Sequence, residues 1–196
     1  MRAPIKKIVL ANNQNDSLAR ALAGQDFRPQ KTIGTRSPAM DIQNASNLER
    51  LLFAASNHKA EAIRGAMRQL ELSGSISLPE EWRDRLAGVF EAASVDDAET
   101  IAEIERVFRT TGRLIDPHTA VAAAALRKVS NCGSGPKVIF ATADAAKFPE
   151  TVYEATGQRP EPPERLRRQL SAREKFETMN SNINQLRDYI EARVLG

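Results

Sequence analysis

The sequence contains a single cysteine, Cys132, among 196 residues. One thiol cannot form an internal disulfide, and the surrounding stretch "SNCGSGP" offers no second Cys and no His that could complete a metal site. We therefore expect an inert loop thiol and no bound metal. A lone reduced cysteine also fits a cytoplasmic protein.

Long hydrophobic runs are absent as well. The only apolar run near the N-terminus covers residues 8–11, which is far shorter than a signal-peptide core or a membrane span. We therefore expect no membrane partner.

No block of charge of one sign stands out in the sequence. The net charge of +3 is spread along the chain, and no Lys/Arg cluster is interleaved with aromatic residues as a nucleic-acid surface requires. The densest basic run, "ERLRRQ" at residues 164–169, contains its own Glu and is typical of a solvated helix face. Nucleic acid is therefore not an expected partner.

The sequence does have the composition of a folded globular protein. Hydrophobic residues make up 41% and charged residues 27% of the chain, and its length suffices for one domain with a sizeable core. We expect one α/β body with a small helical appendage.

Hydrophobic periodicity and capping signals divide the chain into strands and helices. Strands are predicted at residues 6–13, 89–95 and 137–142. Helices are predicted at residues 15–24, in two segments of 47–72 with a break at 56–60, from Pro79 to Gly88, at 96–112, from Pro117, at 149–157 and at 179–194. Residues 25–42 have no periodicity and predict a long irregular loop, a kind of segment that is often functional.

Strands that alternate with helices predict an α/β fold, with a mostly parallel sheet and helices on both faces. The helix from Pro117 is rich in Ala and Val, and such a small, smooth face favours packing against a sheet. Three strands are few for this architecture. Either further strands are unrecognised or the chain is part of something larger.

Thr142 ends the apolar run "KVIFAT", which we interpret as a buried strand. In a parallel α/β sheet, ligands bind at the carboxyl ends of the strands. Thr142 is therefore a candidate binding residue.

Three segments together resemble the threonine synthase family. They are "SPAMDIQNASNLERLLF" at 37–53, "GRLIDPHTAVAAAAL" at 112–126 and "VIFATADAAKFPETV" at 138–152, and the opening "IVLANNQND" is also similar. Their order and separations match the family, and the resemblance covers most of residues 5–157.

The resemblance implies the tryptophan-synthase-β type of pyridoxal-phosphate fold (fold type II), in which both parts of the sequence build one large sheet. Residues 1–157 would then be the C-terminal portion of the large cofactor-binding α/β domain, and residues 158–196 a C-terminal helical tail. The intact enzyme would convert O-phospho-L-homoserine and water to L-threonine and phosphate with pyridoxal 5'-phosphate as its cofactor.

Two family features have no counterpart in this sequence. The Schiff-base lysine and the loop that holds the cofactor phosphate both precede the region that is resembled. The only glycine cluster, "CGSGP" at 132–136, comes before a predicted strand, whereas a phosphate cradle follows a strand and opens a helix. We therefore expect a fragment without a catalytic residue of its own, which is inactive and does not bind the cofactor when alone.

The expected partners follow from this interpretation. They are the N-terminal half of the same protein, the small-molecule substrate O-phosphohomoserine, and further copies of the chain, because the face that the absent half would cover should be apolar.

By the resemblance, Thr142 lies where the family places a hydroxyl against the pyridine nitrogen of the cofactor. A threonine hydroxyl can donate a hydrogen bond to an unprotonated ring nitrogen. The alternative is that Thr142 only caps the following helix. The family usually has His-Pro where this sequence has Asp144 and Ala145, so Asp144 is instead a candidate helix cap.

Asn15, Asp16, Ser37 and Asp41 lie in the resembling segments at a strand end or in the long loop, where site residues concentrate. They are possible pocket residues, and turn or cap hydrogen bonds are the alternative. His118 matches a family histidine near a helix start and is a further pocket candidate, although a lone His without a fixed acid partner is typically structural.

A second function stays open at this point. The chain could be a stand-alone, non-catalytic α/β binding or regulatory module, because a fold does not fix a function.

Overall fold

The computed structural model describes residues 4–129, 133 and 135–194, so the predicted loop thiol Cys132 lies outside the described residues. The chain forms two compact units, residues 1–161 and 162–196, and each is described by itself. The division after Gly157, which the sequence suggested, stays a prediction.

A two-stranded parallel sheet lies at the centre of the first unit. Strand β1 (Ile8–Asn12) pairs with β2 (Phe90–Ser94), in a register that sets Ile8 opposite Phe90 and Asn12 opposite Ser94. Both strands and their parallel direction were predicted from the sequence.

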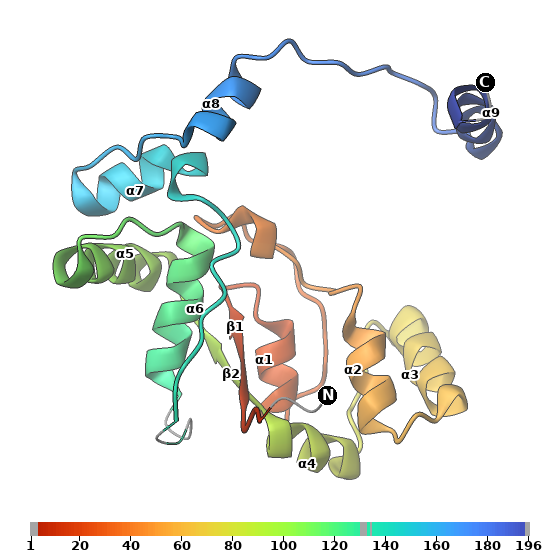
Figure 1. Ribbon diagram of the computed structural model, residues 1–196. Helices are drawn as coiled ribbons and strands as arrows, with labels where there is room; N and C mark the ends of the chain where they lie inside the picture. The colour runs from red at the N-terminus through yellow and green to blue at the C-terminus, as the bar shows by residue number, and fades with distance from the viewer. Residues whose placement is uncertain (1–3, 130–132, 134, 195–196) are drawn as a thin grey trace. The chain divides into compact units, whose positions relative to one another are not determined.

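Helices cover both faces of this sheet (Figure 1). Helix α6 (Pro117–Lys128) packs its small residues against one face, where Val121 and Ala125 meet Val9, Ala11 and Ala93. Because successive strand residues point to opposite faces, Phe90 points away from α6. It packs into the core that α1 (Ser17–Leu22) and α4 (Glu80–Val89) form on the other side.

Helices α2 (Leu48–Ala55) and α3 (Ala60–Ser73) complete this second core together with α4. The turn between α2 and α3 places Asn57 and His58 in the left-handed region, with φ of 56° and 62°. The predicted break at residues 56–60 is therefore confirmed.

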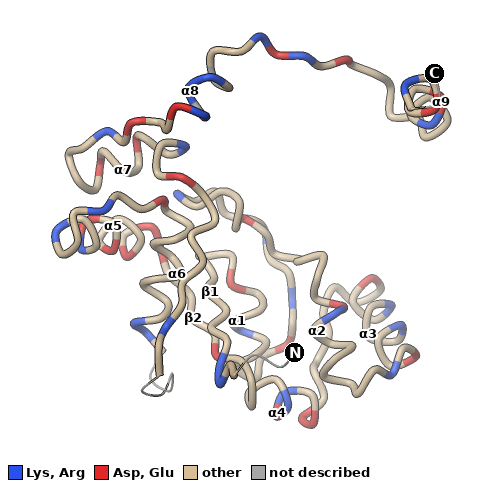
Figure 2. Tube along the Cα trace, viewed as in Figure 1, with Lys and Arg blue, Asp and Glu red and all other residues tan. Residues whose placement is uncertain are grey.

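Helix α5 (Asp97–Thr111) packs against α6 and against α7 (Pro149–Thr156). A capping box of Asp96 and Glu99 begins α5, since the Asp96 side chain accepts from the Glu99 N–H and the Glu99 side chain accepts from the Asp96 N–H. Acidic and basic residues are interspersed along this helix (Figure 2).

The prediction of a strand at residues 137–142 is wrong for this structure. The segment pairs with no strand among the described residues, and its side chains are exposed, Val138 by 78% and Phe140 by 80%. The pattern of the sequence is that of a buried strand. A strand forms only when another strand accepts its backbone hydrogen bonds, and the described part of the chain provides none there.

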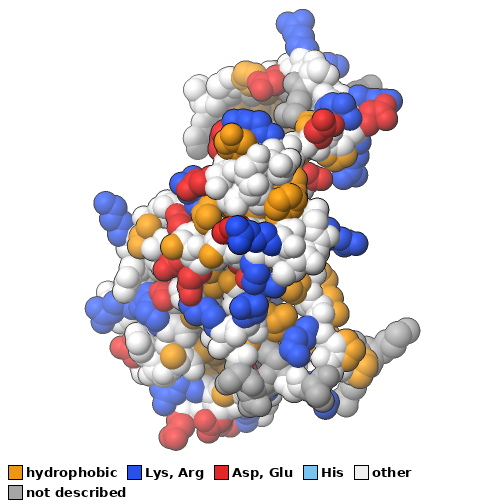
Figure 3. Space-filling view, turned by 90° about the vertical axis from the view of Figure 1, so that its left-hand side faces the viewer, with side chains coloured by type: hydrophobic (Ala, Val, Ile, Leu, Met, Phe, Trp, Pro, Cys, Tyr) orange, Lys and Arg blue, Asp and Glu red, His pale blue; other side chains and the backbone are white. Residues whose placement is uncertain are grey.

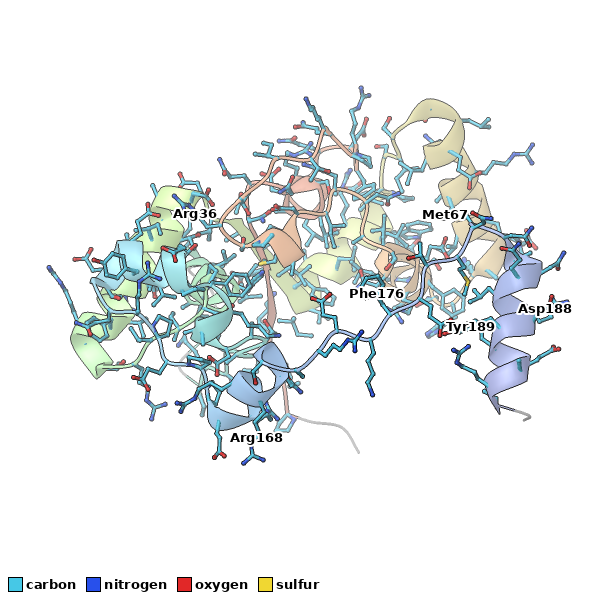
Figure 4. All side chains as sticks on the ribbon, turned by 90° about the horizontal axis from the view of Figure 1, so that it is seen from above. Arg36, Met67, Arg168, Phe176, Asp188 and Tyr189 are labelled. Carbon is cyan, nitrogen blue, oxygen red and sulfur yellow. The ribbon has the colours of Figure 1, made fainter. Side chains whose placement is uncertain are left out.

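The 3₁₀ turns η1 (Pro38–Met40) and η2 (Ala145–Lys147) flank the site described below. The second unit contains α8 (Glu164–Leu170) and α9 (Ile183–Val194), and Figure 4 labels Phe176 on the segment between them. The last helix begins at Ile183 rather than near the predicted Met179. None of the described helices combines the length and hydrophobicity that a membrane crossing requires.

Candidate functional site

The carboxyl end of β1 leads directly into a buried cluster of polar side chains. Asn13 is only 1% exposed, and its amide nitrogen donates to the Asp41 carboxylate (2.8 Å), the Thr35 hydroxyl (2.8 Å) and the Ser37 hydroxyl (3.1 Å). Its amide oxygen accepts from the backbone and side-chain nitrogens of Asn15 at 2.9 and 3.1 Å. Asn13 thus joins the end of the strand to the long loop.

Asn15 extends this cluster along the loop. Its side-chain nitrogen donates to the Ile33 carbonyl (2.9 Å) and its oxygen accepts from the Ile33 N–H (2.9 Å), so the amide pairs with the loop backbone as another strand would. The same oxygen accepts from the Gln43 side chain at 3.2 Å. We call Asn13, Asn15, Thr35, Ser37, Asp41 and Gln43 the Asn13 network.

Asp41 carries the only ionised group of the Asn13 network. One carboxylate oxygen accepts from Asn13 (2.8 Å), Asn15 (3.1 Å) and the Thr35 hydroxyl (2.7 Å), and the other accepts from the Thr35 N–H (3.0 Å). Four donors of this chain therefore stabilise the charge, without a Lys or Arg among them. The loop is held by a carboxylate at its centre.

His118 lies beside the network and is 7% exposed. Its Nδ1 lies 2.9 Å from a carboxylate oxygen of Asp116, and its Nε2 accepts from the backbone N–H of Ala39 at 3.1 Å. Asp116 is 1% exposed and also accepts from the His118 N–H and the Thr119 hydroxyl. The acid partner that the sequence did not reveal for His118 is therefore Asp116, the N-cap of the same helix.

Two further contacts fix the long loop from outside the network. The Arg36 N–H donates to the Asp97 carboxylate at the start of α5 (2.9 Å), and the Arg36 guanidinium, labelled in Figure 4, forms an ion pair with Glu154 of α7 (2.8 Å). Asp16 lies apart from the network, because its carboxylate accepts from Arg20 one helical turn later at 2.9 Å.

Thr142 lies on the exposed segment and makes no hydrogen bond to another residue in the described part of the chain. Two residues later Asp144 accepts from the Ala146 N–H at 2.8 Å, so it caps the 3₁₀ turn η2 rather than the helix α7 that follows. The chain neighbours of Thr142, Ala141 and Ala143, line an open cleft of ≈ 320 Å³, and Thr142 itself does not. The cleft is lined by Leu114, Ile115, Asp116, Thr119, Ala141, Ala143, Asp144, Ala145, Pro160 and Glu161.

The structure thus brings Asn15, Ser37 and Asp41 into one network with His118 at its border, and leaves Asp16 and Thr142 outside it. Sequence reasoning missed Asn13, Thr35 and Gln43. The pair of amide residues that ends the first strand was the available signal, since Asn side chains often bond to nearby backbone and turn groups.

Charged groups elsewhere form local pairs. A hydrogen bond from Lys128 and one from the Asp96 backbone lower the pKa of the Glu99 carboxyl, and Lys128 also donates to the Ser94 carbonyl at the end of β2 (2.7 Å). Figure 3 shows basic, acidic and apolar side chains interspersed on the face that it presents. Among residues 4–129, 133 and 135–194, no three His, Cys, Asp or Glu side chains are grouped as a metal site requires.

The fold and the site together define part of an α/β protein: a parallel sheet covered by helices on both faces, with polar side chains gathered at the carboxyl end of a strand. Comparisons with known proteins specify the family. Residues 119–190 match the family model described as "Threonine synthase, C-terminal".

Individual relatives agree. The chain is 34% identical to the threonine synthase of Pseudomonas aeruginosa over 167 residues, which are 85% of this chain and 36% of that protein. The crystal structure of a PLP-bound threonine synthase from Brucella melitensis matches with a TM-score of 0.87 and 36% identity, over 98% of this chain and 41% of that one. Yeast threonine synthase shares the fold, with a TM-score of 0.81 at 24% identity.

The chain is therefore similar to the C-terminal part of threonine synthases. It spans about two fifths of the length of the threonine synthases of Pseudomonas aeruginosa and Brucella melitensis.

Proposed function

We propose that this chain is the C-terminal part of an enzyme that converts O-phospho-L-homoserine and water to L-threonine and phosphate, and that it is inactive without the N-terminal part. The observation that carries the proposal is the match to a PLP-bound threonine synthase over 98% of this chain but only 41% of that enzyme. The remaining portion of such an enzyme would supply the Schiff-base lysine and the cradle for the cofactor phosphate.

Thr142 fits the role of a cofactor partner. Its side chain is exposed, and no described residue accepts its hydroxyl hydrogen, so the hydroxyl can donate to the pyridine nitrogen. When bound, pyridoxal phosphate would supply an electron sink for the carbon chemistry. The contribution of Thr142 would be to hold the ring nitrogen through a neutral hydrogen bond.

The Asn13 network would shape the substrate side. It holds the loop of residues 33–43 at the carboxyl end of β1, where a parallel sheet places its ligands. Asn15, Ser37 and Asp41 already bond to one another or to the loop, so we propose that they order this wall of the pocket. Asp16 and His118 remain proposed residues of the same region.

The exposed segment of residues 137–142 supports the need for a second part. Its extended backbone has no pairing strand in the described chain, and Val138, Ile139 and Phe140 are exposed by 78%, 38% and 80%. We propose that a strand of the N-terminal part pairs with it. When that part is absent, the same apolar segment would favour self-association.

A chimera tests this proposal. The portion of the Brucella melitensis threonine synthase that precedes the matched region is joined to this chain, and the controls are that portion alone and this chain alone. We expect the chimera to bind pyridoxal phosphate and to release phosphate from O-phosphohomoserine, and both controls to be inactive.

Two outcomes would contradict the proposal. One is a cofactor on this chain alone that borohydride fixes to one of its own lysines. The other is a folded chimera that binds the cofactor and yet releases no phosphate, which would favour a non-catalytic binding module.

A further inference from the structure

His118 contacts two segments to which the proposed function gives roles, the loop of the Asn13 network and the segment that follows Thr142. Its Nε2 bonds to the backbone of Ala39 in η1, within the loop that carries Ser37 and Asp41. Its ring packs against Phe148, which ends the turn that follows Thr142, with 4.8 Å between the ring centroids. One buried ring thus touches both segments.

The hydrogen bonds fix the protonation state of the ring. A backbone N–H can only donate, so Nε2 must accept from Ala39 and cannot carry a proton. The proton of the neutral ring then lies on Nδ1, where it is donated to Asp116. Asp116 is itself held by the His118 N–H (2.9 Å) and by the Thr119 hydroxyl, so it fixes the orientation of the ring.

We propose that His118 is a positioning residue, which as a neutral Nδ1–H imidazole holds the η1 turn in register with the segment that carries Thr142. This inference rests on the proposed function, because the relative position of the two segments affects activity only if substrate and cofactor bind between them. It assigns His118 no proton transfer, since both ring nitrogens are engaged within the chain.

The surroundings of η1 show what His118 contributes. The sequence separation between Ala39 and His118 is 79 residues, and η1 has three residues and no buried side chain of its own. Met40 at its C-terminal end packs against the core that contains Val121 and Ala125, and hydrogen bonds to neighbours hold the rest of the turn. Ser37 at one end is held by Asn13, Asp41 at the other end by the rest of the network, and Ala39 between them by His118.

Two substitutions separate the two bonds of the ring. His118→Gln places a carboxamide oxygen near the position of Nε2, so it can still accept from Ala39. His118→Asn places a carboxamide nitrogen near Nδ1, so it can still donate to Asp116 but no longer reaches Ala39. The two variants are matched in polarity and differ in which partner they keep.

The first readout uses this chain as it stands. Residue-resolved hydrogen exchange should show the Ala39 amide exchanging roughly five- to tenfold faster in His118→Asn, the loss expected for one hydrogen bond, and nearly unchanged in His118→Gln. The Gly112 amide, which bonds to Phe108 at 2.8 Å, serves as the control and should not change. Nitrogen-15 shifts of the wild-type ring should show a protonated Nδ1 and an unprotonated Nε2.

The second readout uses the chimera. His118→Asn should raise the KM for O-phosphohomoserine several-fold while His118→Gln leaves it near the wild-type value. A residue that only stabilises the fold would lower the fraction of active enzyme and therefore the apparent kcat, without moving KM.

The outcomes are distinguishable. The positioning role is overturned if the exchange rate of the Ala39 amide is unchanged in His118→Asn, or if Nε2 is protonated in the wild type. The second result decides the question even if one variant fails to fold. A folded wild-type chimera that binds the cofactor but releases no phosphate refutes the proposed function, while the exchange data still decide whether His118 holds the turn.

Discussion

Replacing Asp41 by Asn tests whether a carboxylate is the organising group of the Asn13 network. The substitution keeps the size of the side chain but removes its charge and replaces one acceptor oxygen by an NH₂ donor. If the remaining oxygen keeps its bonds to Asn13, Asn15 and the Thr35 hydroxyl, the new NH₂ group faces the Thr35 N–H that now donates to the carboxylate at 3.0 Å. Two donors would then oppose each other.

The expected cost follows from these contacts. Loss of one hydrogen bond to a charged acceptor costs about 1.5–3 kcal/mol, and the unsatisfied Thr35 N–H adds to it, so we expect Asp41→Asn to lower the free energy of unfolding by about 2–4 kcal/mol. For a chain of this size that corresponds to a fall in Tm of roughly 5–15 °C.

Urea and thermal unfolding of purified chain, followed by circular dichroism, measure this difference. Asp26→Asn is the matched control, because Asp26 is exposed and its carboxylate accepts no hydrogen bond from another described residue. The control should change stability by less than about 0.5 kcal/mol. If Asp41→Asn is no less stable than Asp26→Asn, the network does not depend on the charge and the reasoning is refuted.

Three other predictions concern single side chains. In the chimera, Thr142→Val should lower turnover by roughly ten- to a hundredfold, the equivalent of one unmade buried hydrogen bond, and should alter the cofactor spectrum. Thr142→Ser should lower turnover much less, because the hydroxyl donor remains. Unchanged turnover and an unchanged spectrum in Thr142→Val would show that Thr142 is not a cofactor partner. Because the pKa of Glu99 is lowered in the fold, its bond to Lys128 stabilises the protein above the ordinary pKa of 4.5, and this contribution disappears as the pH falls through the lowered value. Lys128→Met should flatten the pH dependence of unfolding in that acidic range, and an unaltered profile would contradict the assignment. At Asn57, whose φ is 56°, substitution by Ala should cost about 1 kcal/mol of stability while Gly is tolerated, and equal denaturation midpoints for the two variants would show that the turn carries no strain.

The sequence by itself determined the local elements, because their signals act between near neighbours. Asp96 and Glu99 form the capping box that begins α5, and Asp116 caps α6 ahead of Pro117. Gly112 ends α5 in the left-handed conformation that favours glycine. The family resemblance could also be stated from the sequence, since it rests on the order of short motifs.

Only the tertiary structure decided which polar residues meet. Asn13 and Asp41 are separated by 28 residues, and Ala39 and His118 by 79, so no local pattern predicts that they bond. The segment of residues 137–142 shows the opposite case: its apolar pattern is that of a strand, but it stays unpaired in the described chain. A strand is a property of two segments, and the hydrogen bonds that make one depend on a partner that the segment's own sequence does not contain.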